Sequence, residues 1–362
     1  MNAVTRAMKA LVLSGGKPSR LRPITHSSAK QLIPIANKPI LFYGLEAIAR
    51  AGIQEVGIVV GDTAPEIRAA VGDGSAFGFK ATYIAQEAPL GLAHAVKVAR
   101  PFIGDSPFLM FLGDNILKEG LEPLLEDFSA RKPNAQILVA KVPNPSAFGV
   151  VELEGERVVR LVEKPPEPKS DLALVGVYLF DKAIFEAIEH LRPSARGELE
   201  ITEAVQWLVD RQRRVLARRV EGWWKDTGKL SDLLEANRLI LESLKHSVAP
   251  EAHVDALSRI EGRVALGPGA RVVQSVIRGP AVIGANAQLV KSTVGPYTSV
   301  YFDTVIENSE IEHSIVLESA RIRNVKRIQD SLIGRRVEVI KSPVMPEAYR
   351  IMVGDSSRIE IP

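Results

Sequence analysis

The chain has 362 residues, of which 46% are hydrophobic and 25% are charged, and its formal net charge is +3 at pH 7. So small a net charge argues against a broad basic face for nucleic acid and fits local sites for small anions. The sequence contains no cysteine, which excludes disulfides, thiolate catalysis and cysteine-ligated zinc.

Length and hydropathy set the expected number of domains and the expected location. At roughly 100–200 residues per domain, the chain suggests about two or three domains. The N-terminal apolar run is too short for a signal peptide, and no stretch reaches the roughly 18 apolar residues of a membrane span. We therefore expect a cytoplasmic protein with no membrane partner and no nucleic-acid partner.

Up to about residue 250, apolar stretches of strand length alternate with helical patterns. The predicted strands cover residues 8–16, 55–62, 108–115 and 135–142. The predicted helices between them cover residues 39–52 and 91–102. This alternation indicates an α/β fold with a parallel sheet covered on both faces, whose ligands bind at the carboxyl ends of the strands.

After residue 250 the helical pattern stops and a repeat of constant length begins. The repeat places serine at positions 275, 292 and 309, and apolar residues at positions 266, 283, 300 and 317. Within one repeat the apolar positions advance in steps of five or six. This spacing is typical of hexapeptide-type β-helix coils, with an ordinary β-sandwich as the alternative.

The stretch LSGGKPSRLRPITHSSAK (residues 13–30) follows the first predicted strand and has the composition of a phosphate-binding loop. Gly15 and Gly16 would let the backbone approach phosphate oxygens, and Arg20 and Lys30 would neutralise charge. It is neither a Walker A loop nor a Rossmann G-x-G-x-x-G loop. By itself, the glycine pair also fits a plain strand–helix turn.

Three carboxylates stand out at the ends of predicted strands or beside aromatic residues. Asp114, in the motif GDN, is well placed to hold Mg²⁺ that carries a nucleotide phosphate, and a turn or N-cap aspartate is the alternative. Asp226, in WWKDTG, is a second candidate for the same metal. Glu163 and Lys164, in VEKP, form either a binding pair or a solvated surface pair.

These motifs follow one another in a specific order along essentially the whole chain. The order is GG-x-x-S-R-L-R-P-x-T…K, Q-x-x-x-x-G-L-A-x-A, G-D-N, F-G-V-V-E, V-E-K-P, G-V-Y, R-G-E-L-E-I-T and W-K-D-T-G. It resembles that of the sugar-1-phosphate nucleotidylyltransferases. The resemblance is greatest to the long type of glucose-1-phosphate thymidylyltransferases, which carry a left-handed β-helix after the catalytic domain.

The resemblance implies a fold and a reaction. The fold would be a Rossmann-like nucleotidyltransferase domain with a mainly parallel sheet in residues 1–248, followed by a left-handed parallel β-helix in residues 249–362. In the reaction, an oxygen of glucose 1-phosphate attacks the α-phosphorus of dTTP in line, which gives dTDP-glucose and pyrophosphate. Such a reaction needs alignment and charge neutralisation and no covalent enzyme intermediate.

The resemblance also assigns roles to residues in the matching motifs. The implied catalytic residues are Arg20, Lys30 and Lys164. The implied nucleotide-binding residues are Leu13, Gly15, Gly16, Ser19, Gln86, Gly91 and Asp114. The implied sugar-phosphate residues are Asn115, Gly149, Glu163, Lys164 and Tyr178. Asp114 and Asp226 would hold the Mg²⁺ cofactor.

The first loop departs from the family pattern G-x-G-T-R at two positions. Ser19 replaces threonine and keeps the hydroxyl group. Pro18 replaces glycine, which removes an amide donor and restricts φ to the narrow range that the proline ring allows. Either that amide does not contact phosphate in the native loop, or this chain binds its triphosphate less well than its relatives.

Several alternatives stay open at this point. UTP could replace dTTP, because uracil and thymine differ by one methyl group, and an amino-sugar 1-phosphate could replace glucose 1-phosphate. The chain could also be a non-catalytic regulatory relative. The C-terminal domain could carry acyltransferase activity with His253 or His313 as a base, although we expect it to mediate assembly into a homo-oligomer.

Overall fold

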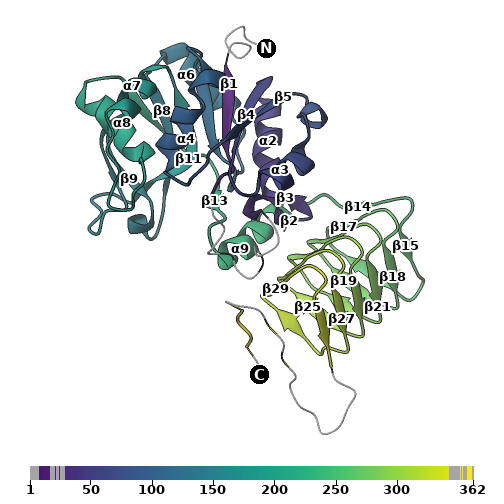
Figure 1. The fold of residues 1–362 in the computed structure, drawn as a ribbon. Coiled ribbons are helices and arrows are strands. Elements are labelled where there is room, and N and C mark those ends of the chain that lie inside the picture. The colour runs from purple at the N-terminus through teal and green to yellow at the C-terminus, as the bar shows by residue number, and fades with distance from the viewer. Residues whose placement is uncertain are drawn as a thin grey trace. The chain divides into compact units, whose positions relative to one another are not determined.

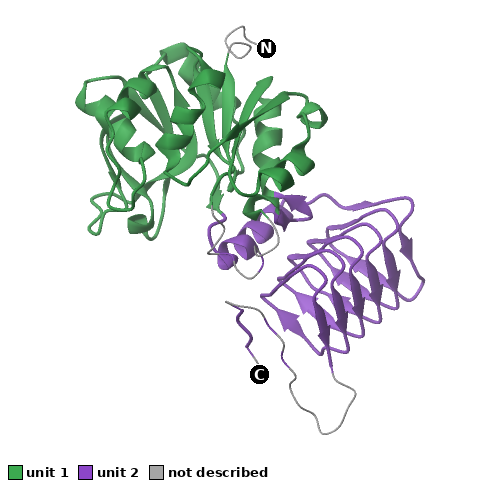
Figure 2. Ribbon diagram, in the orientation of Figure 1, with its two compact units in different colours: residues 1–18, 28–32, 40–226 green, residues 19–27, 33–39, 227–362 purple. Residues whose placement is uncertain are grey.

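The computed structural model describes residues 8–16, 21, 24, 29–341, 351, 353 and 357–360. Pro18, Ser19 and Arg20 lie outside the described residues, so their predicted roles stay predictions. The structure divides into two compact units (Figure 2): unit 1 holds residues 1–18, 28–32 and 40–226, and unit 2 holds residues 19–27, 33–39 and 227–362. Among the described residues, no helix is long and apolar enough to cross a membrane.

Unit 1 is built around a nine-stranded sheet (Figure 1). In spatial order its strands are β5 (Lys80–Ala85), β4 (Glu55–Val60), β1 (Lys9–Leu13), β6 (Phe108–Leu112), β11 (Leu172–Phe180), β8 (Ala135–Lys141), β12 (Val215–Arg219), β10 (Arg157–Glu163) and β9 (Gly149–Glu154). The strands predicted from the sequence are confirmed as β1, β4, β6 and β8. Every strand shares one direction except β10 and β11, which run antiparallel to their neighbours.

Strand β11 corrects the expectation of a uniformly parallel sheet. It lies between β6 and β8, is antiparallel to both, and is buried at every residue. We predicted no strand in this stretch, although its sequence LALVGVYLF is the unbroken apolar run expected of a strand covered on both faces. The sheet is therefore mainly parallel with an antiparallel strand at its centre.

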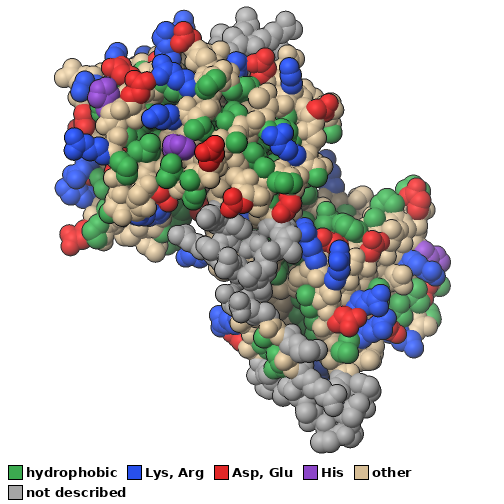
Figure 3. Space-filling view, in the orientation of Figure 1, with side chains coloured by type: hydrophobic (Ala, Val, Ile, Leu, Met, Phe, Trp, Pro, Cys, Tyr) green, Lys and Arg blue, Asp and Glu red, His purple; other side chains and the backbone are tan. Residues whose placement is uncertain are grey.

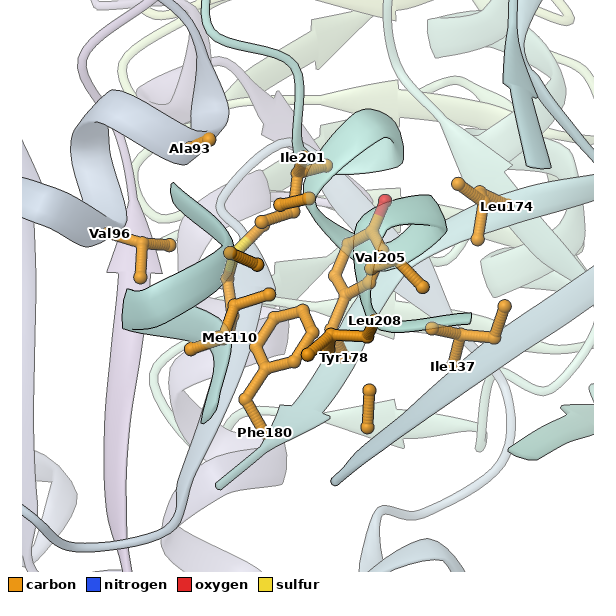
Figure 4. Packing of buried hydrophobic residues seen from close by; sticks show 14 of the residues in the cluster. Ala93, Val96, Met110, Ile137, Leu174, Tyr178, Phe180, Ile201, Val205 and Leu208 are labelled. Atoms are coloured by element: carbon orange, nitrogen blue, oxygen red, sulfur yellow. The ribbon is translucent and has the colours of Figure 1, made fainter. Parts of the chain in front are cut away.

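Alternate residues of the strands feed two hydrophobic cores, one on each face of the sheet. In β1, Leu11 and Leu13 join one core while Ala10 and Val12 join the other, because successive side chains point to opposite faces. The first core, shown in part in Figure 4, packs against α4 (Leu92–Val98), α5 (Arg100–Ile103), α7 (Ala183–Glu189) and α8 (Ile201–Asp210). The second packs against α2 (Ile40–Arg50), α3 (Ala64–Val71) and α6 (Glu122–Arg131).

Both predicted helices are present, and one of them is interrupted. The helix expected at residues 39–52 is α2, with a buried face that includes Leu41, Leu45 and Ile48. The helix expected at residues 91–102 is divided into α4 and α5. Pro101 lies in the first turn of α5. Proline has no amide hydrogen, so the hydrogen bonding of α4 does not continue through it, whereas the first turn of a new helix tolerates it.

Unit 2 contains three parallel sheets of short strands that surround one core (Figure 1). The first sheet is β14 (Ser247–Val248), β17 (Val264–Leu266), β20 (Ala281–Ile283), β23 (Thr298–Val300), β26 (Ile315–Val316) and β29 (Leu332–Ile333). The second is β15 (His253–Val254), β18 (Arg271–Val273), β21 (Gln288–Val290), β24 (Val305–Glu307), β27 (Arg321–Arg323) and β30 (Glu338–Ile340). The third is β16 (Arg259–Glu261), β19 (Val276–Arg278), β22 (Thr293–Val294), β25 (Glu310–Glu312) and β28 (Ile328–Gln329). Consecutive strands visit the three sheets in turn, which is a parallel β-helix and excludes the β-sandwich alternative.

The predicted repeat is confirmed for two coils and needs one correction. Leu266 pairs with Ile283, and Ile283 pairs with Val300, each at the predicted interval. The next residue in the column is Val316 and not the predicted Leu317. The corner between Ile311 and Val316 is one residue shorter than the equivalent corner before Val300, so this coil is shorter than the two before it.

The serines of the repeat form a hydrogen-bonded ladder inside the coils. The amide of Ser292 donates to Ser275 Oγ at 3.0 Å, and the amide of Ser309 donates to Ser292 Oγ at 3.3 Å. Each hydroxyl donates in turn to the carbonyl two residues before it, as Ser292 does to Val290 at 2.8 Å. The serines are buried, so the ladder satisfies backbone amides that water does not reach.

Unit 2 also holds helix α9 (Leu230–Leu241) and the hairpin β2 (Pro34–Ile35)–β3 (Lys38–Pro39). The buried Asn237 of α9 joins the hairpin to the coils. Its Oδ1 accepts from the amide of Ala36 at 2.9 Å and from the hydroxyl of Ser299 at 2.5 Å, and its Nδ2 donates to the Tyr297 carbonyl at 2.9 Å. These three bonds tie the hairpin and the helix to strand β23 within the unit.

Charged side chains of both signs are interspersed over the described surface in the view of Figure 3. This distribution agrees with the small net charge of +3. We therefore expect function at local clusters of side chains and not over one broad charged face.

Candidate active site

The carboxyl ends of four adjacent parallel strands bring the predicted nucleotide-side residues together. Gln86 follows β5, Gly61 follows β4, Gly15 and Gly16 follow β1, and Asp114 follows β6. The backbones approach closely here, because a Cβ atom on Gly61 would lie 3.0 Å from the carbonyl oxygen of Gly15. These residues line one edge of the sheet, where α/β proteins bind their ligands.

Lys30 and Asp114 form the charged centre of this edge. Lys30 belongs to the short 3-10 turn η3 (Lys30–Leu32), and its Nζ lies 2.6 Å from Oδ2 of Asp114. The side chains are only 15% and 25% exposed, respectively. Burial raises the pKa of Asp114, but the charge and hydrogen bond of Lys30, together with Asn115, outweigh it and hold that pKa below its usual range.

A two-stranded ribbon brings the second predicted carboxylate beside the first. Strand β7 (Asn115–Leu117) pairs with β13 (Trp224–Asp226) in antiparallel register, and Asp226 is the partner of Asn115. Asp226 is therefore directly opposite the residue that follows Asp114. The ribbon thus brings the backbones of two aspartates, separated by over a hundred residues in sequence, to neighbouring positions.

Asn115 acts as an internal link between the elements around the two carboxylates. It is buried, its Nδ2 donates to Asp114 Oδ1 at 2.9 Å, and its Oδ1 accepts from the indole of Trp224 at 2.5 Å and the amide of Gly176 at 3.3 Å. A Cβ atom on Gly176 would lie 2.8 Å from Cγ of Asn115, so glycine is needed there. Asn115 was predicted on the sugar side, and in this structure its side chain holds Asp114 and β13 in place.

The donor set of this edge fits a magnesium ion. Mg²⁺ prefers oxygen ligands and is usually held by one or two carboxylates, with phosphates and water completing its shell. Asp226 ends one strand of the ribbon, and Asp114 directly precedes the other, so two carboxylate residues are available at this place. Among the described residues there is no group of three or more histidine, cysteine, aspartate or glutamate side chains that could hold a metal ion.

Of the predicted sugar-phosphate residues, Lys164 and Gly149 lie beside Glu163, at the end of β10, and Asn115 does not. Thr202 Oγ1 donates to Glu163 Oε2 at 2.6 Å, and Arg196 lies 3.3 Å and Lys164 lies 3.4 Å from Glu163 Oε1. Lys164 has a φ of 42°, a left-handed conformation that is uncommon for a non-glycine residue and turns the chain sharply after the strand. The cluster places the Glu163 carboxylate, which can accept hydrogen bonds from hydroxyl groups, beside the cations Lys164 and Arg196, which can bind a phosphate.

Gly149 and Tyr178 lie next to this cluster in different ways. Gly149 pairs with Glu163 across β9 and β10, and a Cβ atom on it would lie 3.3 Å from Glu163 Oε2 and 2.8 Å from Leu174. The ring of Tyr178 stacks on Phe180 in the hydrophobic core (Figure 4). Burial first, and the charge of Glu163 second, raise the pKa of Tyr178.

Gln86 and Gly91 are also adjacent. Gly91 is the N-cap of α4 with a φ of 101°, and a Cβ atom there would collide with the Leu199 carbonyl. Gln86 Nε2 lies 3.2 Å from the Gly91 carbonyl. Leu13, the last residue of β1, is buried, and its carbonyl accepts from the amide of Gly113 at 3.0 Å.

Several residues of the site were quoted in motifs without a role. Thr202 and Arg196 belong to the motif R-G-E-L-E-I-T, and Trp224 belongs to W-K-D-T-G. His94, which contacts Gln86, belongs to G-L-A-x-A at its variable position. The motifs signalled their neighbourhood, but only the fold shows which side chain each one contacts.

Comparison with known proteins shows the family to which this chain belongs. Residues 9–243 match the nucleotidyl transferase family. The glucose-1-phosphate thymidylyltransferase of Streptomyces griseus is 55% identical over 98% of this chain and 99% of its own length, and that of Streptomyces antibioticus is 54% identical over 98% and 99%. A Bacillus anthracis protein described as a glucose-1-phosphate thymidylyltransferase, crystallised with sucrose, has a TM-score of 0.61 at 35% identity and covers 64% of this chain and 94% of that one. The chain belongs to the nucleotidyl transferase family, in the group of the glucose-1-phosphate thymidylyltransferases.

Proposed function

We propose that this chain transfers the thymidylyl group of dTTP to glucose 1-phosphate and releases pyrophosphate, with dTDP-glucose as the product. The observation that carries the proposal is the convergence of Lys30, Asp114 and Asp226 at one sheet edge. The full-length similarity to two thymidylyltransferases supports the choice of substrates. The nucleoside triphosphate substrate in turn favours a cytoplasmic location.

The triphosphate would bind over the first loop. The backbone of Leu13, Gly15 and Gly16 lies at the carboxyl end of β1, where amides can approach phosphate oxygens. Lys30 would neutralise charge on the α-phosphate and the departing pyrophosphate. Arg20 and Ser19, outside the described residues, would add a cation and a hydroxyl to the same loop.

Mg²⁺ would be held by Asp114 and Asp226, where it would neutralise phosphate charge that develops in the transition state. Asn115 keeps Asp114 in position through its Nδ2 bond of 2.9 Å. Lys30 supports the ionised form of Asp114 in the free enzyme, since it lowers the pKa of that carboxyl group against the effect of burial. The binding site is therefore charged before the substrate arrives.

The sugar phosphate would bind at the Glu163 cluster. Glu163 would accept hydrogen bonds from sugar hydroxyls, while Lys164 would bind the phosphate whose oxygen attacks the α-phosphorus. Gly149 leaves space beside Glu163, and the hydroxyl of Tyr178 borders the same region. Phosphoryl transfer of this kind requires orientation and charge neutralisation, which this arrangement supplies without a nucleophilic side chain.

We further propose that the C-terminal coils, whose first strand is β14 (Ser247–Val248), form the left-handed β-helix predicted for residues 249–362, after the catalytic domain predicted for residues 1–248. Stacked coils expose regular faces that suit self-association, and we propose that this domain assembles the chain into a homo-oligomer. Size-exclusion chromatography with light scattering measures the mass directly, and a monomer at micromolar concentration would contradict this assignment.

The substrate assignment is tested by initial rates with glucose 1-phosphate and each of dTTP, UTP, GTP, ATP and CTP, read as pyrophosphate release. We expect dTTP to give the highest kcat/KM and EDTA to abolish the rate. A preference for UTP would replace the proposed base by uracil. No turnover with any of the triphosphates would favour the non-catalytic alternative.

A further inference from the structure

His94 and Gln86 form a pair at the nucleotide side whose geometry fixes a side-chain orientation. Gln86 Nε2 lies 3.2 Å from the carbonyl of Gly91 and 3.1 Å from Nδ1 of His94. The Gly91 carbonyl can only accept a hydrogen bond, so the group that faces it must be the amino group of Gln86. The amino group has two hydrogens, one for each of these acceptors.

This arrangement also defines the state of the imidazole ring. Nδ1 of His94 must be unprotonated in order to accept from Gln86, which leaves the ring hydrogen on Nε2. Burial, and then the charge of Lys97 on the same helix, lower the pKa of His94, in agreement with a neutral ring. His94 is the third residue of α4, a helix anchored in the hydrophobic core through Ala93 and Val96 (Figure 4), so the ring is held on a rigid element.

The other end of the carboxamide faces the first loop. Oε1 of Gln86 lies 3.1 Å from the position that a Cβ atom of Gly15 would occupy. Because residue 15 is glycine, no side chain covers that oxygen. With both amino hydrogens engaged on the opposite side, Gln86 presents an acceptor, and not a donor, to whatever binds over Gly15.

We propose that His94 is a positioning residue that holds the Gln86 carboxamide with its oxygen toward the nucleobase, and so selects a base that carries a ring N–H. Thymine and uracil have this donor at N3, whereas cytosine has an acceptor nitrogen at the same position. If the Gln86 carboxamide rotated by half a turn, its Oε1 would face the Gly91 carbonyl and His94 Nδ1, which are both acceptors. The amino group would then face the base, and the selection for a ring N–H would be lost. The inference rests on the proposed function and on the role that the family resemblance implies for Gln86, which is nucleotide binding.

Two substitutions of similar polarity at His94 distinguish a role in positioning Gln86 from a role in packing alone. In His94→Asn, the amide oxygen takes the place of Nδ1 and can still accept from Gln86. In His94→Gln, the acceptor lies one bond further from the backbone, near the place of Nε2. The two variants have similar polarity, and glutamine has the higher helix propensity, so a weaker helix cannot explain a larger loss in His94→Gln than in His94→Asn.

The readouts are KM for dTTP, the inhibition constant of CTP against dTTP, and kcat, for the full-length protein with Mg²⁺ and saturating glucose 1-phosphate. For His94→Gln we expect KM for dTTP to rise on the order of five- to tenfold and CTP to inhibit more strongly, with a smaller change in kcat. For His94→Asn we expect both constants within about twofold of wild type. Thermal unfolding of both variants confirms that they fold.

Equal effects of the two substitutions, or no effect of either, would overturn the inference. If both variants fail to fold, His94→Ala tests the same arrangement, because it removes the acceptor that holds the Gln86 amino group and should let CTP inhibit more strongly; an unchanged inhibition constant of CTP in His94→Ala would also overturn it. Failure of the proposed function is recognised separately, since wild-type enzyme would then show no turnover of dTTP.

Discussion

The ammonium group of Lys30 lies 2.6 Å from Oδ2 of Asp114, and this ion pair holds a charged carboxylate in a largely buried place. Burial alone would raise the pKa of Asp114, and Lys30 reverses the direction. In the proposed reaction both groups meet the same triphosphate, Lys30 directly and Asp114 through the metal. The pair therefore keeps the site charged and ordered until the substrate takes over both partners.

Lys30→Met should destabilise the fold in a pH-dependent way. A carboxyl group whose pKa is depressed in the folded state adds stability above its unfolded pKa, and this stability is lost as the pH falls through the folded pKa. Without Lys30, the two largest influences that lower the pKa of Asp114 are lost, so this pKa should rise and the variant should carry a cost at neutral pH that disappears in acid. We expect a loss of about 1–3 kcal/mol at pH 7 that shrinks toward pH 4, measured by urea unfolding. A loss independent of pH would show that the ion pair does not set the state of Asp114.

Asp114→Asn and Asp226→Asn should each lower kcat by orders of magnitude at saturating Mg²⁺, because each removes a proposed metal carboxylate while keeping the shape of the side chain. Asp105→Asn, at an aspartate whose side chain is 86% exposed, is the matched control and should leave kcat unchanged. Far-ultraviolet circular dichroism checks the folds. Turnover near the wild-type value in either site variant would remove that residue from the metal site.

Thr202→Val should weaken binding of the sugar phosphate selectively. The substitution keeps the shape of a buried side chain and removes the 2.6 Å hydrogen bond to Glu163 Oε2. A freed carboxylate loses its fixed orientation, so we expect KM for glucose 1-phosphate to rise by about three- to tenfold. KM for dTTP, measured in the same protein, should hold. A parallel rise in both constants would mean that Thr202 supports the whole site and not the sugar side.

The sequence predicts much of this fold because two periodicities are strong. Apolar runs ending in glycine and aspartate indicate β1, β4 and β6, and the constant interval between serines indicates the coils. Strand β11 escapes prediction because an isolated apolar run is consistent with either a strand or a buried helix. The shorter coil before Val316 escapes because a one-residue deletion at a corner leaves no mark in composition.

The site shows a similar division. Motif order indicates Asp114, Asp226, Glu163 and Lys164, since these residues lie in recognisable motifs. Contacts such as Trp224 to Asn115 join segments more than a hundred residues apart, and no local pattern encodes them. Asn115 illustrates the point, because its motif suggests a ligand contact while its side-chain oxygen accepts two hydrogen bonds from the protein.

Ser292→Ala should destabilise the C-terminal unit. The substitution leaves the amide of Ser309, inside the coil, without its acceptor at 3.3 Å, while the Val290 carbonyl loses the hydroxyl donor at 2.8 Å and keeps the Asn308 amide at 2.9 Å. An unsatisfied buried polar group costs about 1–3 kcal/mol, which should appear as a lower midpoint of urea unfolding. Ser243→Ala, at an exposed serine, is the control and should change the midpoint little. If the two variants unfold alike, the ladder does not contribute to stability.

Asn237→Asp should make the stability of the protein depend on pH in the opposite direction from an ordinary surface aspartate. The introduced carboxylate keeps the two acceptor bonds from Ala36 and Ser299 but turns an oxygen toward the Tyr297 carbonyl, where Nδ2 of Asn237 now donates at 2.9 Å. Two acceptors at that distance repel, and burial adds to the cost of the charged form.

The pKa of the introduced carboxyl group should therefore rise in the folded state, because only the protonated form can donate to Tyr297. A group whose folded pKa is raised destabilises the fold above that pKa and recovers as the pH falls below it. Relative to wild type, we expect Asn237→Asp to lose on the order of 1–3 kcal/mol at pH 8 and less at pH 5, measured by urea unfolding. Asn237→Leu, which cannot be protonated, should lose a similar amount at both values. A loss that is equal at pH 5 and pH 8 in the aspartate variant would show that Asn237 does not need its donor to hold the hairpin and helix α9 on the coils.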